Sequence, residues 1–160
     1  MTAAPRRALI AYYAAFFALL GAELPFLPIW FAHRGLDPIW VGAALSLGFV
    51  MRALMTPAAG LWSDRRGAPA QTIRTAAMAA APVFLLAALA PTALSTALLA
   101  TLASALIGPT LALTDVAAMR LKAAGVDYGR ARLWGSASFL AASTAMGAIV
   151  ERFGPESVAV

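Results

Sequence analysis

The sequence contains no cysteine, one histidine and few charged residues. Only 12% of its 160 residues are charged, whereas 62% are hydrophobic. A soluble domain has about 25% charged and about 45–50% apolar residues, so this chain lacks the charges for a water-facing surface. The absence of cysteine excludes disulfide and thiolate chemistry. His33 stands alone, without a metal-ligand or nucleophile–base grouping, so we expect no enzyme activity, metal or cofactor.

The charges are also bunched, which leaves long apolar stretches between them. No residue from Thr75 to Thr114 is charged, and Glu23 is the only charged residue between Arg7 and Arg34. A crossing takes about 20 mostly apolar residues, and the long uncharged run is broken by turn-forming residues at 91–96. The sequence therefore predicts an all-α integral membrane protein with five spans, at about residues 8–31, 39–62, 75–90, 97–118 and 133–150.

The first apolar stretch carries two further signals. It runs from Ala8 to about Ala32, which is longer than the roughly 7–15 residues of a signal-peptide core. We therefore interpret it as an uncleaved first span. Pro25 and Pro28 lie in its last third and predict a kink, because a proline removes a helical hydrogen bond.

The basic residues indicate the orientation of the spans. With the N-terminus inside, nine fall in inner segments and only Arg34 and Arg152 fall in outer ones. The inner residues are Arg6, Arg7, Arg65, Arg66, Arg74, Arg120, Lys122, Arg130 and Arg132. This positive-inside bias predicts a cytoplasmic N-terminus, and it explains the net charge of +5 without nucleic-acid binding. The four tryptophans are expected at the membrane boundaries, Trp30 and Trp40 outside and Trp62 and Trp134 inside.

Glu23 is a carboxyl group in an apolar span. It lies about 22 Å along the first span from Ala8, which is inside the hydrocarbon and toward its outer side. A charge there costs several kcal/mol unless it faces a cavity or a partner, and a carboxyl group avoids this cost by holding a proton. Glu23 is therefore a candidate for proton coupling. The alternative is a neutral side chain that hydrogen-bonds a neighbouring helix.

Arg52 poses the opposite problem, because an arginine keeps its proton and needs an anion. It lies about 20 Å into the second span from the outer end. The anion is either a protein carboxylate, for which Asp115 is the obvious candidate, or a substrate carboxylate or phosphate bound by the guanidinium. Asp115 itself is a second candidate for proton coupling, and its alternative is an inner-face salt bridge.

Two strings of residues carry a more specific pattern. The loop from Gly60 to Gly67 holds Asp64 and Arg65 between its two glycines, which permit a tight turn and close helix approach. Asp64 is positioned to cap a helix N-terminus. The other string runs from residue 127 to 136 and opens the fifth span, where the small pair Gly135 and Ser136 permits close helix packing.

These strings resemble those of the major facilitator superfamily. The first has the loop pattern Gly-x-x-x-Asp-Arg-x-Gly, although Ala68 and Pro69 replace the two basic residues that usually close it. The second resembles the Tyr-Gly-x-x-Arg-x-Trp-Gly-Ser string of the lactose-permease-like and phenylpropionate-permease-like branch. Its matching residues are Tyr128, Gly129, Arg132, Trp134, Gly135 and Ser136. Leu113-Thr114-Asp115 and Pro25-Phe26-Leu27-Pro28 fit the same branch.

The resemblance implies twelve helices in two halves, with the substrate bound between the halves near the midplane. The chain would be an incomplete N-terminal half, residues 1–160, that lacks a C-terminal half. Glu23, Arg52 and Arg132 are the substrate-binding candidates, and Glu23 and Asp115 the proton-coupling candidates. Gly60, Asp64, Arg65 and Gly67 are expected to control the conformational change.

The leading hypothesis for function is symport of a proton with a small organic solute, such as an aromatic acid, by alternating access. The protein would lie in the bacterial inner membrane, with the lipid bilayer, the solute and the proton as its partners. A sugar or nucleoside symporter is the alternative within transport. A non-transporting membrane fragment or scaffold is the alternative outside it, because one half cannot alternate access alone. Further spans encoded downstream would distinguish the two classes.

Overall fold

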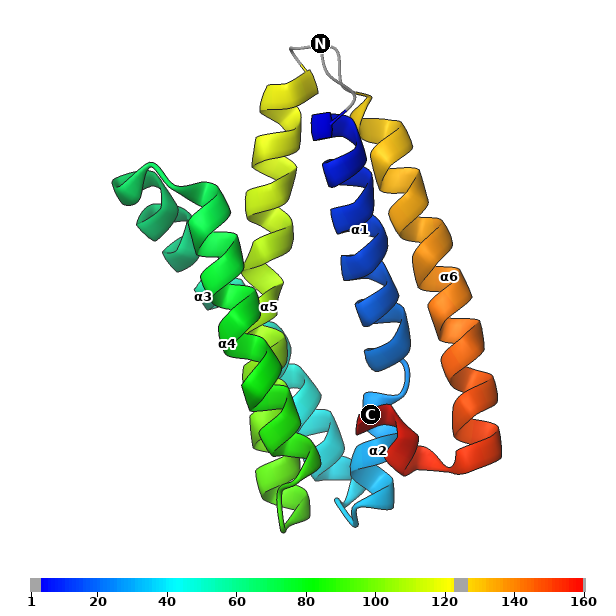
Figure 1. Ribbon diagram of the computed structural model, residues 1–160. Coiled ribbons are helices and arrows are strands. Elements are labelled where there is room, and N and C mark those ends of the chain that lie inside the picture. Colours follow the sequence, from blue (N-terminus) through cyan, green and yellow to red (C-terminus); the bar gives the residue numbers. More distant parts are fainter. Residues whose placement is uncertain (1–3, 123–126, 160) are drawn as a thin grey trace. The chain divides into compact units, whose positions relative to one another are not determined.

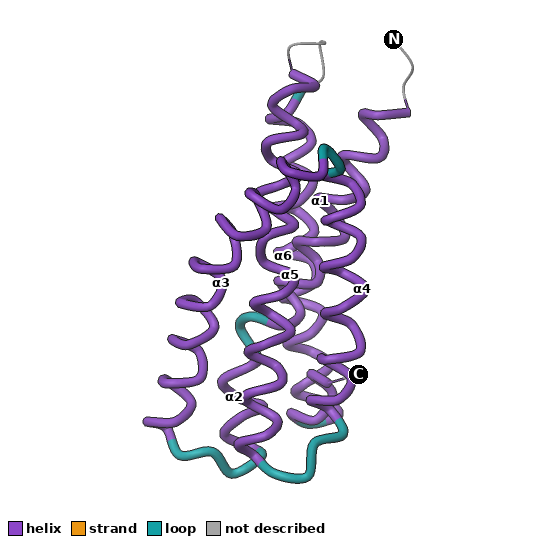
Figure 2. Tube along the Cα trace, turned by 90° about the vertical axis from the view of Figure 1, so that its left-hand side faces the viewer, coloured by secondary structure: helices purple, strands orange, loops and turns teal. Residues whose placement is uncertain are grey.

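The computed structural model describes residues 4–122 and 127–159, and in these ranges the regular structure is helical (Figures 1 and 2). The elements are α1 (Ala4–Glu23), α2 (Leu27–His33), α3 (Pro38–Arg66), α4 (Pro69–Ala88), α5 (Ala93–Lys122), α6 (Tyr128–Phe153) and the 3-10 helix η1 (Pro155–Ala159). They supply five segments long and apolar enough to cross a membrane. The predicted fold class and the number of spans are therefore confirmed.

Most of the helices extend beyond the predicted spans, and side-chain caps begin two of them. Asp37 precedes α3 and its Oδ1 accepts a hydrogen bond from the backbone N–H of Ile39 at 2.9 Å. Asp127 caps α6 in the same way, accepting from the N–H of Arg130 at 3.0 Å. A helix can thus begin in a loop before it reaches hydrocarbon. Residues 123–126 of the predicted inner loop lie outside the described ranges.

The first span is interrupted near its prolines. α1 ends at Glu23, a turn occupies residues 24–26, and α2 begins at Leu27. The N–H of Phe26 bonds the carbonyl of Glu23 at 3.0 Å, which closes the turn. The break falls where Pro25 and Pro28 lack the N–H groups that a continuous helix would use. By contrast, Pro57, Pro82 and Pro109 lie inside helices.

The described chain divides into two compact units, and the first combines its two ends. Of the described residues, this unit contains 4–27, 116–122 and 127–158, and its main contact is between α1 and α6. The two helices run side by side (Figure 1). They approach each other closely at Gly21, where an added Cβ would collide with the backbone of Phe139. The hydroxyl of Ser143 donates a hydrogen bond to the Gly21 carbonyl at 2.8 Å.

The second unit, residues 28–115, contains α3, α4 and most of α5. Between α3 and α5, the Thr101 hydroxyl donates to the Ala44 carbonyl at 3.2 Å. At the far end of α4, Arg34 donates to the carbonyls of Ala88 at 2.7 Å and Ala90 at 3.1 Å. Because these carbonyls have no partner within the helix, Arg34 acts as a cap for the C-terminal end of α4.

The four tryptophans, predicted at the membrane boundaries, differ in exposure. Trp40, Trp62 and Trp134 are more than half exposed, which fits a boundary position, but Trp30 is fully buried. Its ring packs against Phe84 of α4, with ring centroids 6.1 Å apart, and the Arg34 guanidinium lies 5.8 Å from its centroid. Spacing from the span ends cannot reveal that this ring faces another helix, and the boundary position of Trp30 stays a prediction.

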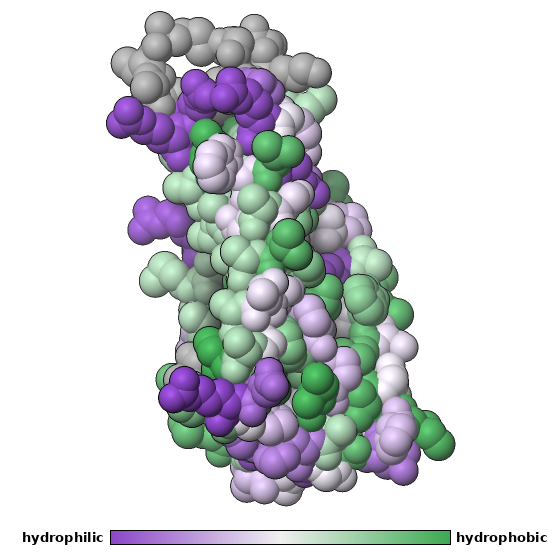
Figure 3. Space-filling view, turned by 90° about the vertical axis from the view of Figure 1, so that its right-hand side faces the viewer, coloured by the Kyte–Doolittle hydropathy of each residue, from purple (hydrophilic) through white to green (hydrophobic). Residues whose placement is uncertain are grey.

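The outer surface of the helices is strongly apolar. Large exposed side chains include Leu54, Leu85, Leu89, Leu133 and Leu140. Figure 3 shows apolar and weakly polar residues over most of one face, with the strongly hydrophilic residues gathered toward its ends. In water these side chains would be unfavourable, whereas in lipid they are in their preferred environment.

The close approach at Gly21 gives a first prediction. Gly21→Ala should lower the stability of the protein by about 1–3 kcal/mol, because the backbone at Phe139 cannot turn aside as a side chain can. The matched control is Gly147→Ala, whose added Cβ would lie 3.6 Å from the ring of Phe26, an ordinary contact. Thermal unfolding in detergent measures both variants, and equal unfolding temperatures would contradict the packing argument.

Candidate functional site

Glu23 is the last residue of α1 and belongs to the first unit. Its side chain is 7% exposed, although it carries an ionisable group. The carbonyl end of a helix carries a partial negative charge, so α1 gives an ionised carboxylate no support there. Glu23 thus places an ionisable side chain in a buried position at the break of the first span.

Arg132 lies on α6 in the same unit and is held against aromatic rings of α1. Its guanidinium carbon is 4.8 Å from the ring centroid of Phe17 and 5.5 Å from that of Tyr13. Tyr128, at the start of α6, meets Tyr13 edge to face at 6.1 Å. Cation–π contacts of this kind hold the charged group in place while the side chain stays half-buried. A fixed guanidinium beside aromatic faces can bind an organic anion that carries a ring.

The other residues of the Tyr128–Ser136 string differ in how far they are exposed. Gly135 is buried, and an added Cβ would lie 2.7 Å from the ring of Phe17. Gly129, Trp134 and Ser136 are exposed. The string thus contributes a packing glycine and the cation near Phe17 to the α1–α6 pair, while part of it faces outward.

Arg52 lies in the middle of α3 and rests on the backbone of α5 at Gly108. An added Cβ at Gly108 would lie 2.5 Å from Cγ and 2.8 Å from Nε of Arg52. The guanidinium makes one long hydrogen bond, from Nη2 to the Ser104 carbonyl at 3.5 Å. Its Nε is buried without a hydrogen-bond partner among the described residues. The absence of a side chain at Gly108 therefore makes room for Arg52. Most N–H donors of its guanidinium form no hydrogen bond with the described residues.

Asp115 is not the partner of Arg52 in this unit. The guanidinium reaches Ser104, which precedes Asp115 by eleven residues, or about 16 Å of helix. Among the described residues of the second unit, Arg52 forms no ion pair with a carboxylate. Of the two anions considered for Arg52, the structure disfavours the one supplied by Asp115.

The Gly60–Gly67 loop differs from its expected form. Asp64 lies in the last turn of α3 and is exposed, and the residue before α4 is Ala68, which offers no side-chain cap. The prediction that Asp64 caps a helix N-terminus was therefore wrong. Gly67 ends α3 instead, with a positive φ of 60° and its N–H bonded to the Asp64 carbonyl at 3.3 Å. Gly60 is helical and nothing approaches the position of its missing side chain.

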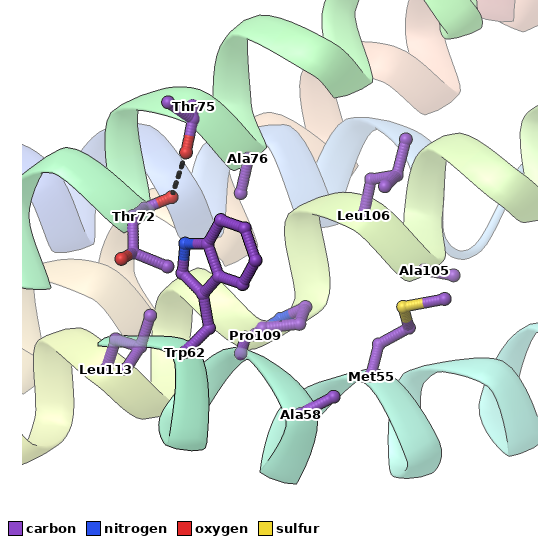
Figure 4. Close-up of a pocket in the computed structure, with 11 residues that line it drawn as sticks. Met55, Ala58, Trp62, Thr72, Thr75, Ala76, Ala105, Leu106, Pro109 and Leu113 are labelled. Atoms are coloured by element: carbon purple, nitrogen blue, oxygen red, sulfur yellow. Dashed lines mark hydrogen bonds between the residues drawn. The ribbon is translucent and has the colours of Figure 1, made fainter. Parts of the chain in front are cut away.

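A hollow of about 350 Å³ lies between α3, α4 and α5 in the second unit (Figure 4). Its lining is mostly apolar, and the indole of Trp62 projects into it from α3. The residues that line it are Met55, Ala58, Ala59, Trp62, Thr72, Thr75, Ala76, Ala105, Leu106, Pro109 and Leu113. In Figure 4 the Thr75 hydroxyl bonds the backbone carbonyl of Thr72, at 3.0 Å, so little hydrogen-bonding capacity faces the hollow.

Several structural residues were not singled out from the sequence. Gly21, Gly108 and Ser143 join helices that are far apart in the chain, and Arg34 closes α4. Glycine within an apolar span is a recognised signal of close helix approach. The partner on the other helix cannot be read from that signal.

The comparisons identify the class of protein. An almost wholly helical chain with five candidate spans and charged groups placed within them is typical of a multi-pass membrane transporter. A family model, the MFS_1 like family of the major facilitator superfamily, matches residues 7–160, and the chain belongs to this family. Neither a curated protein nor a solved structure matches the chain significantly. The narrower resemblance to the lactose- and phenylpropionate-permease-like branch stays a prediction.

The contact between Arg52 and Gly108 can be tested by a double-mutant cycle. Gly108→Ala should destabilise the protein by about 1–3 kcal/mol, because the added methyl group meets the stem of Arg52. In an Arg52→Ala background the same change should cost much less, since the obstacle is gone. Gly48→Ala is the control, with its added Cβ 3.5 Å from Thr101. Additive losses of unfolding temperature would show that the two residues do not interact.

Proposed function

We propose that the protein is part of a proton-coupled symporter for a small organic anion, with an aromatic acid as the preferred solute. The family supplies the class, since its members are membrane transporters. The observation that carries the coupling is the burial of Glu23 at the carbonyl end of α1. A carboxyl group in that position gains most when a proton neutralises it.

The proposed solute follows from the two arginines. Arg52 holds a buried, unused donor, and a guanidinium in an apolar span needs an anion to offset its desolvation. Arg132 presents a second cation beside Tyr13 and Phe17. In the first unit, a carboxylate fits the guanidinium fork of Arg132 and an aromatic ring fits the neighbouring faces of Tyr13 and Phe17. A sugar or nucleoside would bring no negative charge to offset the desolvation of Arg52.

The remaining roles are part of the same proposal. Asp115 is the second candidate for the proton, and it lies half-buried in α5. Gly60, Asp64, Arg65 and Gly67 influence the conformational change, and in this role Gly67 acts by ending α3. The C-terminal half of the transporter is the proposed partner that completes the substrate pathway. The bacterial inner membrane is the proposed location.

The orientation is tested with single cysteines in this cysteine-free chain. Ala70→Cys and Asp37→Cys place a thiol at exposed positions near opposite ends of the α3 and α4 helices. If the N-terminus is cytoplasmic, an impermeant thiol reagent should label position 37 in intact cells and leave position 70 unlabelled until the cells are opened. The opposite labelling pattern would reverse the proposed orientation.

The proton role of Glu23 is tested by Glu23→Gln, which keeps the shape of the side chain and cannot ionise. Gradient-driven accumulation of a labelled aromatic acid in vesicles should be lost. Counterflow of the same solute should persist, because binding and the conformational change do not require the proton to leave. The full-length transporter is assayed by both measurements in the same vesicles.

The control for this experiment is Glu156→Gln, which removes an exposed carboxylate outside the five candidate spans. It should leave both activities near the parental values. Undiminished accumulation by Glu23→Gln would remove the coupling role from Glu23 and direct attention to Asp115. Loss of accumulation and counterflow together would give Glu23 a structural or substrate-binding role.

A further inference from the structure

Two adjoining hollows occupy the end of the second unit where α3 turns into α4. The apolar hollow of about 350 Å³ extends from Trp62 along α3 to Met55, and along α5 to Ala105. A second hollow, of about 600 Å³, lies around the turn and the start of α4. Its lining residues are Gly67, Ala68, Pro69, Ala70, Gln71, Arg74, Thr75 and Met78. Thr75 lines both hollows, so the two meet on α4.

Apolar surface dominates the lining of both hollows, and the charged side chain that lines them lies near the turn. The first is lined almost entirely by apolar side chains and reaches toward the middle of α3 and α5. The second lies around the turn between helices and includes the polar side chains Gln71 and Arg74, both exposed. A molecule that filled both would need an apolar part inside the membrane and a polar part at its surface.

The charge at this end is positive. The guanidinium of Arg66 lies 4.0 Å from the ring centroid of Trp62, so it is held directly over a residue that lines the apolar hollow. Arg74 lines the second hollow, and Arg65 is exposed beside Arg66. Asp64 is the acidic residue of this segment. The basic excess favours an anionic headgroup, because arginine binds phosphate with paired hydrogen bonds.

We infer that this end of α3 and α4 binds an anionic phospholipid of the leaflet that the α3–α4 turn faces. One acyl chain occupies the hollow beside Trp62, and the phosphate lies between Arg66 and Arg74. The apolar hollow beside Trp62 suits the tail of a lipid, and the basic residues near the turn suit its phosphate. The proposal is independent of the solute that the transporter carries.

The experiment compares two lipids with the same acyl chains, palmitoyl-oleoyl phosphatidylglycerol and palmitoyl-oleoyl phosphatidylcholine. Each is added to the detergent-purified full-length protein, and binding is measured by native mass spectrometry. Phosphatidylglycerol should bind about tenfold more tightly than phosphatidylcholine, because basic residues near a membrane surface attract anionic lipids. Equal binding of the two lipids would overturn the inference.

Matched variants locate the site. Arg66→Gln with Arg74→Gln should abolish most of the preference for phosphatidylglycerol. Arg6→Gln with Arg7→Gln removes the same number of exposed charges elsewhere and should leave the preference intact. If both pairs lose the preference equally, the attraction is general electrostatics and the assigned site is wrong. The same measurement detects loss of folding, because an unfolded variant would lose binding of both lipids.

The apolar hollow is tested separately by filling it. Ala76→Leu places a larger side chain in the hollow and should weaken binding of palmitoyl-oleoyl phosphatidylglycerol several-fold. Binding of dihexanoyl phosphatidylglycerol, whose short chains cannot reach as far into the hollow, should change little. Unchanged binding of the long-chain lipid would contradict a tail in this hollow. If inorganic phosphate competes as effectively as the lipid, the site binds an anion only and the inference fails.

Discussion

In the hydrocarbon of a bilayer no water satisfies a polar group, so each polar group in a span must find a partner in the protein or serve a purpose that justifies its cost. The hydrogen bonds between helices follow from this constraint. Ser143 donates to the Gly21 carbonyl and Thr101 donates to the Ala44 carbonyl. Arg34 donates to two carbonyls at the end of α4. The first two bonds give a partner to a hydroxyl group within a span. The bonds of Arg34 give a partner to carbonyls that have none within α4.

Close packing depends on the same solvent. Lipid tails are as apolar as leucine, so helices do not associate through the hydrophobic effect and gain instead from close van der Waals contact. Glycine is the residue that permits such contact. Gly21 admits the backbone of α6 and Gly135 admits the ring of Phe17, whereas Gly108 admits the stem of an arginine. Glycine therefore has two different roles here: it permits close contact between helices, and it makes room for a cation.

The sequence predicted what depends on local composition. Uncharged length and turn residues gave five spans, and the family model agrees with the motifs at Gly60–Gly67 and Tyr128–Ser136 at the level of the superfamily. Long-range partners were not predictable. Nothing in the local sequence shows that Trp30 faces Phe84, or that Arg52 lies on Gly108 and not beside Asp115. Asp64 was misassigned because a glycine can end one helix without the next helix needing a side-chain cap.

The charged residues placed within spans divide according to their proton chemistry. A carboxyl group such as Glu23 can become neutral by binding a proton, which lowers the cost of its burial. An arginine cannot become neutral, so Arg52 bears a desolvation cost that the proposed anion would offset. Arg132 offsets part of the same cost through the faces of Tyr13 and Phe17. Arg52, whose donors are largely unused, is therefore the cation for which an incoming anion would make the largest difference.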